Sequence, residues 1–138
     1  MKNILVPSDG SENAERAVDF AIGLAKQYGA TLHLLNVQHS VGAVSQFVPA
    51  KDVKDFHREE GMKALAPGQK RTEAAAVPVK IHIGVGHAGP TIVAFARQLG
   101  CDHVVMGTRG LGSAVGTLLG STANDLLEKI SVPVTLVK

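Results

Sequence analysis

The stretch that decides the fold is VVMGTRGLGSAVGTLLGST, residues 104–122. Its first three residues, Val104–Met106, form a short apolar run typical of a buried strand, and glycines follow immediately. Beyond it, Leu126, Leu127 and Ile130 recur at helical spacing. The segment therefore predicts a strand, a glycine-rich turn and an amphipathic helix in succession.

The glycines in this turn have a definite spacing. Two residues separate Gly107 from Gly110, nine separate Gly110 from Gly120, and Ser121 and Thr122 come next. Glycines let a ligand approach the backbone closely, and a helix N-terminus offers N–H groups to an anion. The spacing favours a phosphate site. A flexible loop followed by an ordinary Ser/Thr helix cap explains the same residues.

Apolar runs and helical stretches alternate along the whole chain. The five predicted strands are Asn3–Val6, Thr31–Val37, Val79–Gly84, His103–Gly107 and Val132–Val137. This rhythm predicts an α/β fold in which a five-stranded parallel sheet carries helices on both faces. We expect a single domain over residues 1–138, Rossmann-like or flavodoxin-like, with strand order 3-2-1-4-5.

The first two predicted helices differ in strength. Alanines and other apolar residues recur at helical spacing over residues 14–25, and Gly29 is a suitable C-terminal cap. Residues 51–66 predict a weaker helix that Ala66, Pro67 and Gly68 interrupt, with residues 69–76 resuming it. Residues 39–50 before it are expected to form a mobile connection.

Two further helices have recognisable start signals. Pro90 fits the first position of a helix, whose apolar face includes Ile92 and Leu99. Thr122 and Asp125 resemble a capping box at the start of the last helix.

The expected ligand crevice lies where the strand order reverses, between Pro7–Gly10 and Met106–Gly110. Asp9 is placed to accept a ribose hydroxyl or an adenine amino group, or to help hold Mg²⁺, but a turn before the first helix also explains it. Val37 is either an adenine contact or a core residue. Arg109 either screens phosphate charge or is an ordinary surface cation.

Composition argues against several classes of function. The chain has no Trp, 4% aromatic residues and a formal charge of +2, with basic and acidic residues interleaved. We therefore expect no nucleic-acid partner. No apolar run approaches the length of a membrane span, so no membrane role is expected. Cys101 is the only cysteine and predicts a buried free thiol in a reducing compartment, which favours the cytoplasm.

The histidines show no spacing typical of a metal site. They are His33, His39, His57, His82, His87 and His103. His33 and His82 alternate with apolar residues and are expected on strand faces, and a functional role for His87 is conjecture. The sequence contains no cluster of Ser, His and carboxylate residues typical of a hydrolase, so we expect that this protein is not an enzyme.

These motifs together resemble those of the universal stress protein family. Gly107, Gly110, Gly120 and Ser121 match its nucleotide-binding signature G-x2-G-x9-G-[ST]. Three further segments are similar to the family in the right order: Ile4–Ser11, then Gly86, Gly89, Pro90 and Ile92–Ala96, and finally Val132–Val134.

The resemblance implies an α/β fold with five parallel strands, a homodimer, and membership of the branch that binds ATP. By residue, Pro7 and Asp9 would border the adenosine and Val37 would lie near adenine. The phosphate and ribose side would be formed by Met106, Gly107, Gly110, Gly120, Ser121 and Thr122.

The leading hypothesis is a cytoplasmic stress-response protein that binds ATP, with Mg²⁺, and acts as a regulatory switch on a protein partner whose identity is unknown. One alternative is a weak ATP hydrolase or an adenylyl-transferring enzyme that uses Asp9 and Arg109. Another is a dimeric interaction module without nucleotide. The homodimer is expected through the apolar C-terminal strand, because pairing there would cover a sheet edge.

Overall fold

The computed structural model describes residues 1–40, 48–108 and 120–138. Its elements are β1 (Asn3–Pro7), α1 (Glu12–Tyr28), β2 (Thr31–Gln38), α2 (Ala50–Ala74), β3 (Val79–Val85), α3 (Ala88–Gln98), β4 (His103–Gly107), α4 (Ser121–Lys129) and β5 (Val134–Val137). All five predicted strands are present, although β5 begins two residues later than the predicted Val132. Arg109, Gly110 and the rest of the predicted glycine loop lie outside the described residues.

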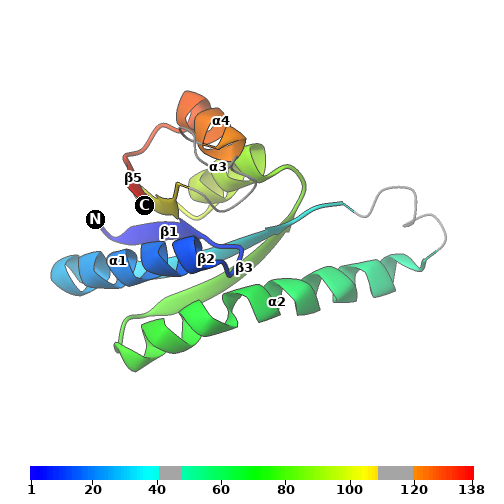
Figure 1. Ribbon diagram of the computed structural model, residues 1–138, viewed down its shortest axis with the longest axis horizontal. Coiled ribbons are helices and arrows are strands. Elements are labelled where there is room, and N and C mark those ends of the chain that lie inside the picture. Colours follow the sequence, from blue (N-terminus) through cyan, green and yellow to red (C-terminus); the bar gives the residue numbers. More distant parts are fainter. Residues whose placement is uncertain (41–47, 109–119) are drawn as a thin grey trace.

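The five strands form one parallel sheet in the order β3-β2-β1-β4-β5, which confirms the predicted topology (Figure 1). β1 is the central strand and pairs with β2 on one side and β4 on the other. The strand order therefore reverses between β1 and β4, and the chain crosses to the other half of the sheet between β3 and β4. In open parallel sheets such a switch point leaves a crevice at the carboxyl ends of the strands.

Helices cover both faces of the sheet, as predicted. α1 and α2 lie on one face and α3 and α4 on the other (Figure 1). The alternation of side chains along β1 shows why both faces need cover. Ile4 and Val6 are fully buried on the face of α1 and α2, and Leu5 is fully buried on the opposite face. Both cores consist mainly of aliphatic side chains.

α2 runs without a break from Ala50 to Ala74, so the predicted interruption at residues 66–68 is wrong. Pro67 lacks one backbone donor, but its fixed φ is compatible with a helix. Gly68 is buried, and a Cβ there would lie 3.4 Å from Val18 and 3.5 Å from Leu34. Close packing of this turn against α1 and β2 outweighs the local helix-breaking signal.

The predicted starts of the last two helices also need correction. The N-cap of α3 is His87, so Pro90 is the third helical residue rather than the first. A proline is tolerated there because the first N–H groups of a helix have no partner within it. The N-cap of α4 is Gly120 and makes no side-chain cap bond, so Thr122 lies inside the helix and does not open a capping box.

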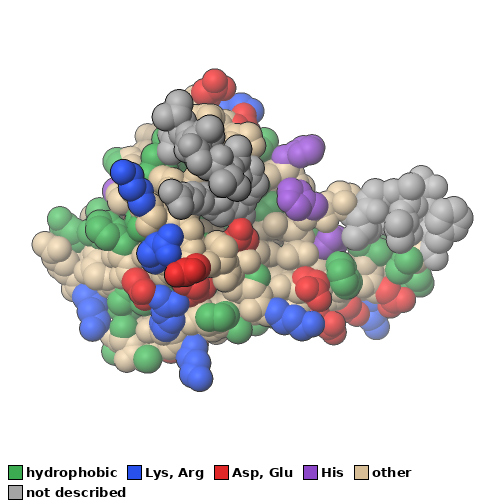
Figure 2. Space-filling view, viewed as in Figure 1, with side chains coloured by type: hydrophobic (Ala, Val, Ile, Leu, Met, Phe, Trp, Pro, Cys, Tyr) green, Lys and Arg blue, Asp and Glu red, His purple; other side chains and the backbone are tan. Residues whose placement is uncertain are grey.

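α1 has the caps that its sequence predicts. The Ser11 side chain accepts a hydrogen bond from the Ala14 backbone N–H at 3.2 Å, and Gly29 ends the helix at φ 67°. A salt-bridge cluster joins α1 to α2, since the Arg71 guanidinium bonds the carboxylates of Glu15 and Asp19. On the face shown in Figure 2, acidic and basic side chains are intermixed along these two helices.

Among the described residues, no helix combines the length and apolar character that a membrane span requires.

Candidate functional site

A cavity of about 900 Å³ opens at the carboxyl ends of β1 and β2. The described residues that line it are Asp9, Asn36, Val37, Gln38, His39, Phe56, Glu60, Ala64, His87, Ala88, Gly89, Pro90, Ser121, Thr122 and Asp125. They come from the β1–α1 turn, the end of β2, α2 and the first turns of α3 and α4. The cavity therefore lies at the predicted edge of the sheet and extends beyond the predicted pair of turns.

The floor of the cavity is a network of buried polar groups. The Asn36 amide donates to the Ser8 backbone carbonyl at 2.9 Å, and the Gln38 amide donates to the Asn36 side-chain oxygen at 2.6 Å. His57 Nδ1 lies 3.5 Å from Gln38 Oε1. Buried polar groups cost free energy unless they are paired. These bonds tie β1, β2 and α2 together below the cavity.

One end of the cavity is formed by two helix N-termini. The N-caps of α3 and α4, His87 and Gly120, provide no side-chain cap bond, and the α4 residues Ser121 and Thr122 add hydroxyl groups. Backbone N–H groups and the helix dipole at such ends attract anions. This end of the cavity has the donors that a phosphate group requires.

Asp125 of α4 lies against the first turn of α3. A Cβ on Gly89 would lie 3.1 Å from the Asp125 carboxyl carbon, so this carboxylate contacts the first turn of α3. Lys129 balances its charge at 3.2 Å. Because the α3 N-terminus already faces a negative charge, the α4 N-terminus is the better position for an anionic ligand.

The other end of the cavity is acidic and apolar. Asp9 and Glu60 contribute carboxylates, and Val37 and Phe56 contribute apolar surface. The β1–α1 turn approaches α2 closely at Gly10, where φ is 81° and a Cβ would lie 3.0 Å from the Ala64 carbonyl oxygen. This end suits an uncharged planar group with hydrogen-bond donors.

Asp9 has a structural role as well as a place in the cavity. Its Oδ1 accepts a hydrogen bond from the Ser11 backbone N–H at 2.9 Å, which is the turn geometry that precedes a helix. The residue is exposed and lines the cavity. Both sequence interpretations of Asp9 therefore fit the same conformation.

The structure separates the predicted site residues into three groups. Four of them line the cavity: Asp9, Val37, Ser121 and Thr122. Four others are buried and lie outside its described lining: Pro7, Met106, Gly107 and Gly120. Two lie outside the described residues: Arg109 and Gly110.

Gly107 is surrounded by protein. A Cβ at this position would clash with the Asn13 side-chain oxygen and would lie 2.8 Å from its Cγ and 3.2 Å from its backbone oxygen. Asn13 is held in place because its amide donates to the Val137 carbonyl at 3.2 Å. The absence of a side chain at Gly107 therefore permits close contact between α1 and β4.

The sequence interpretation missed residues that α2 and α3 bring to the cavity. Phe56 and Glu60 belong to a stretch with a weak helical pattern, and Gly89 precedes a proline that seemed to mark the helix start. The one available signal was the spacing of Phe56, Glu60 and Ala64, which places them on one face of a helix.

The cysteine and the two histidines predicted on strand faces lie within the fold and do not line the cavity. Cys101 is buried, as predicted, and burial raises the pKa of its thiol to about 11. His33 and His82 lie on strand faces with 2.9 Å between His33 Nδ1 and His82 Nε2. Within residues 1–40, 48–108 and 120–138, no group of three or more His, Cys, Asp and Glu is arranged to hold a metal ion.

The topology and the cavity define a doubly wound α/β domain with a ligand-sized crevice at its switch point. The model of the universal stress protein family matches residues 1–138, and the chain belongs to this family. Universal stress protein MJ0531 of Methanocaldococcus jannaschii is 33% identical over 143 residues, which cover 99% of this chain and 82% of that protein.

Two solved structures are similar over nearly the whole chain. The hypothetical protein MJ0577 is 30% identical, with a TM-score of 0.86 and coverage of 99% of this chain and 95% of the other. A universal stress protein in complex with cAMP is 26% identical, with a TM-score of 0.77 and coverage of 99% and 97%.

Proposed function

We propose that this chain binds an adenine nucleotide in the cavity, with the phosphates at the N-terminus of α4 and the base toward Asp9 and Val37. The observation that carries the proposal is the opposite character of the two ends of the cavity. One end offers helix N–H groups and hydroxyls beside one carboxylate, Asp125, that is paired with Lys129, and the other offers two carboxylates and apolar surface. A similar universal stress protein is known in complex with cAMP, which supports the ligand class.

Within this class we propose ATP with Mg²⁺ as the ligand. The oxygen donors at the cavity fit that ion, since Mg²⁺ prefers carboxylates, hydroxyls and phosphate oxygens. Ser121 and Thr122 are the side chains that would hold it beside the phosphates. A bound Mg²⁺ would neutralise part of the phosphate charge, which favours a triphosphate at the N-terminus of α4.

Thermal unfolding and calorimetry with ATP, ADP, AMP and cAMP test the proposal. At a hundredfold excess over Kd, ATP is expected to add about 2.7 kcal/mol to the free energy of unfolding. Combined replacement of Ser121 and Thr122 by Ala is expected to weaken ATP binding by at least about a hundredfold, since hydrogen bonds to charged groups contribute about 1.5–3 kcal/mol each. Ser131→Ala, an exposed serine outside the cavity, is the matched control. Absence of heat and of stabilisation with all four nucleotides would refute the proposal.

We further propose that nucleotide occupancy regulates a homodimer formed through β5, and through it a protein partner. β5 lies at an edge of the sheet, and all four of its residues are partly exposed. Pairing with a second copy would satisfy the free backbone groups of this edge. Sedimentation at micromolar concentration, with and without ATP, measures the association. A monomer under both conditions would contradict it.

We propose binding rather than turnover as the activity of this protein in the cytoplasm. ATP incubated with the protein is then expected to remain intact over many dissociation times. Hydrolysis that Asp9→Ala abolishes while ATP still binds would favour the enzyme alternative instead.

A further inference from the structure

We propose that α2 supplies the base-recognition wall of this cavity, with the Phe56 ring in face contact with the purine and Glu60 keeping phosphate groups away. This inference rests on the proposed nucleotide binding and adds residues outside the glycine signature. It assigns Phe56 as the side chain that makes binding depend on the base and not only on the phosphates.

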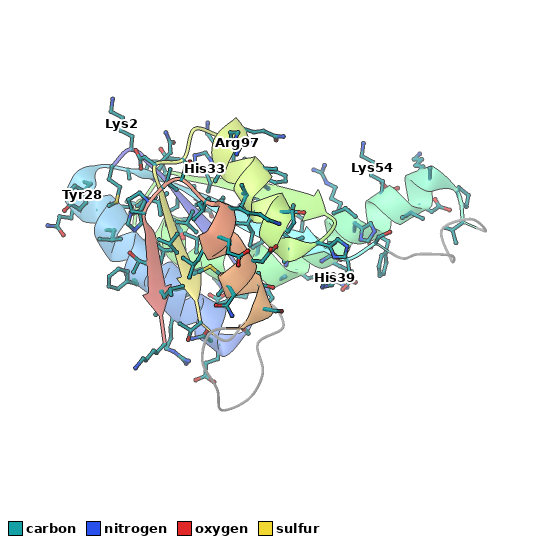
Figure 3. The ribbon with its side chains drawn as sticks, turned by 90° about the horizontal axis from the view of Figure 1, so that it is seen from above. Lys2, Tyr28, His33, His39, Lys54 and Arg97 are labelled. Atoms are coloured by element: carbon teal, nitrogen blue, oxygen red, sulfur yellow. The ribbon has the colours of Figure 1, made fainter. Side chains whose placement is uncertain are left out.

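The length of α2 explains how this helix reaches the site. Its 25 residues span about 38 Å at 1.5 Å per residue, whereas the seven residues of β3 span about 23 Å. The N-terminal turns of α2 therefore project beyond the carboxyl edge of the sheet (Figure 1). Figure 3 shows His39, at the end of β2, beside this part of the helix. The projecting turns stand where the cavity opens.

One face of these turns lines the cavity. Phe56, Glu60 and Ala64 follow at intervals of four residues and all belong to the lining. Phe56 is 50% exposed, so part of its side chain is open to the cavity that it lines. Val37 and Pro90 provide further apolar surface to the same cavity from β2 and α3.

The Phe56 ring has support on one side. It packs edge-on against the His57 ring, with 5.8 Å between centroids and 60° between planes. His57 is 5% exposed and is linked to Gln38 in the polar floor. A ring held in this way loses little conformational freedom when a second planar group stacks on it.

Charge at this end of the cavity determines which part of a nucleotide lies beside Phe56. Asp9 and Glu60 are both carboxylates, so a phosphate placed here would meet like charge. Lys63 offsets part of the Glu60 charge at 3.4 Å, but this pair is solvent-exposed and therefore weak. The uncharged base is the part of the ligand that fits, and its amino group can donate to a carboxylate.

The first experiment compares Phe56→Ala with Phe20→Ala. Phe20 is a surface phenylalanine of α1 with a similar exposure, 47%, and it does not line the cavity. Phe56→Ala is expected to lower ATP affinity about tenfold by calorimetry, within the range found when a base loses an aromatic partner. Its affinity for inorganic tripolyphosphate is expected to remain unchanged, and Phe20→Ala is expected to bind both ligands like the parent protein.

The second experiment uses Phe56→Trp as a reporter. The chain contains no Trp, so all indole fluorescence comes from position 56. ATP is expected to quench this fluorescence on stacking, whereas tripolyphosphate at saturation is expected to leave it unchanged.

The outcomes separate this inference from the proposed function. If the parent protein binds no nucleotide, both fail. If it binds ATP but Phe56→Ala binds equally well, or ATP leaves the fluorescence of Phe56→Trp unchanged, only the role of α2 is overturned. An equal loss of ATP and tripolyphosphate affinity in Phe56→Ala would also overturn it, because a base-specific contact cannot weaken phosphate binding.

Discussion

The Gly107→Ala variant distinguishes a ligand-binding glycine from a packing glycine. The resemblance to the family signature implies that Gly107 contacts a nucleotide, whereas the structure places Asn13 against it. An added methyl group would have to displace the Asn13 side chain or move α1 away from β4. We therefore expect the substitution to destabilise the protein in the absence of any nucleotide.

The magnitude follows from two contributions. Forcing a methyl group into a packed interior costs about 1–3 kcal/mol. Loss of the 3.2 Å hydrogen bond from Asn13 to the Val137 carbonyl adds about 1 kcal/mol. The expected total is about 2–4 kcal/mol, which at a slope of about 2 kcal/mol/M lowers the urea midpoint by about 1–2 M.

Urea unfolding of nucleotide-free protein measures this change. Gly23→Ala is the control, since a Cβ at that helical position meets no atom within 4 Å and Ala is expected to stabilise the helix by about 0.5–1 kcal/mol. In the Asn13→Ala background, Gly107→Ala should cost less, because the obstructing side chain is gone and only the contact with the backbone oxygen of residue 13, at 3.2 Å, remains. If Gly107→Ala unfolds at the parent midpoint and changes only ATP affinity, the packing explanation is refuted.

Three further predictions concern ionisable groups. Arg71→Ala removes the 2.6 Å bond to Glu15 and is expected to lower the free energy of unfolding by about 2 kcal/mol. Burial raises the pKa of Glu15 and Arg71 opposes that rise, so the decrease in urea midpoint should be larger at pH 7 than at pH 4. An equal decrease at both pH values would contradict this prediction. Burial lowers the pKa of His33 and of His82, so as the pH falls the unfolded chain takes up protons before the folded protein does. The free energy of unfolding should therefore decrease below about pH 6.5, and it should depend less on pH in His82→Gln. The Cys101 thiol, with its pKa raised to about 11, should react with a disulfide reagent only after unfolding, and a stoichiometric reaction of native protein would disprove its burial.

The strand order was predictable because few topologies satisfy a strict alternation of strands and helices. The carboxyl ends of parallel strands share one edge of the sheet, so Asp9 and Val37 could be assigned to the site from their positions in the sequence alone. The start of α4 could be assigned to the same edge, because the preceding strand ends there.

Local signals failed where packing decides the conformation. Pro67 and Gly68 predicted a break in α2, but the contacts of Gly68 with Val18 and Leu34 keep the helix continuous. A continuous α2 is long enough to extend past the sheet and bring Phe56 and Glu60 to the cavity.

The amino-acid sequence by itself determined the fold and the edge of the sheet at which the cavity opens, because both follow from periodicity and from the position of turns relative to strands. Only the tertiary structure decided which side chains form the cavity and which glycines serve packing. Contacts such as Asn13 with Gly107 and Asp125 with Gly89 join segments about 94 and 36 residues apart, and no local pattern encodes the close approach of such distant segments.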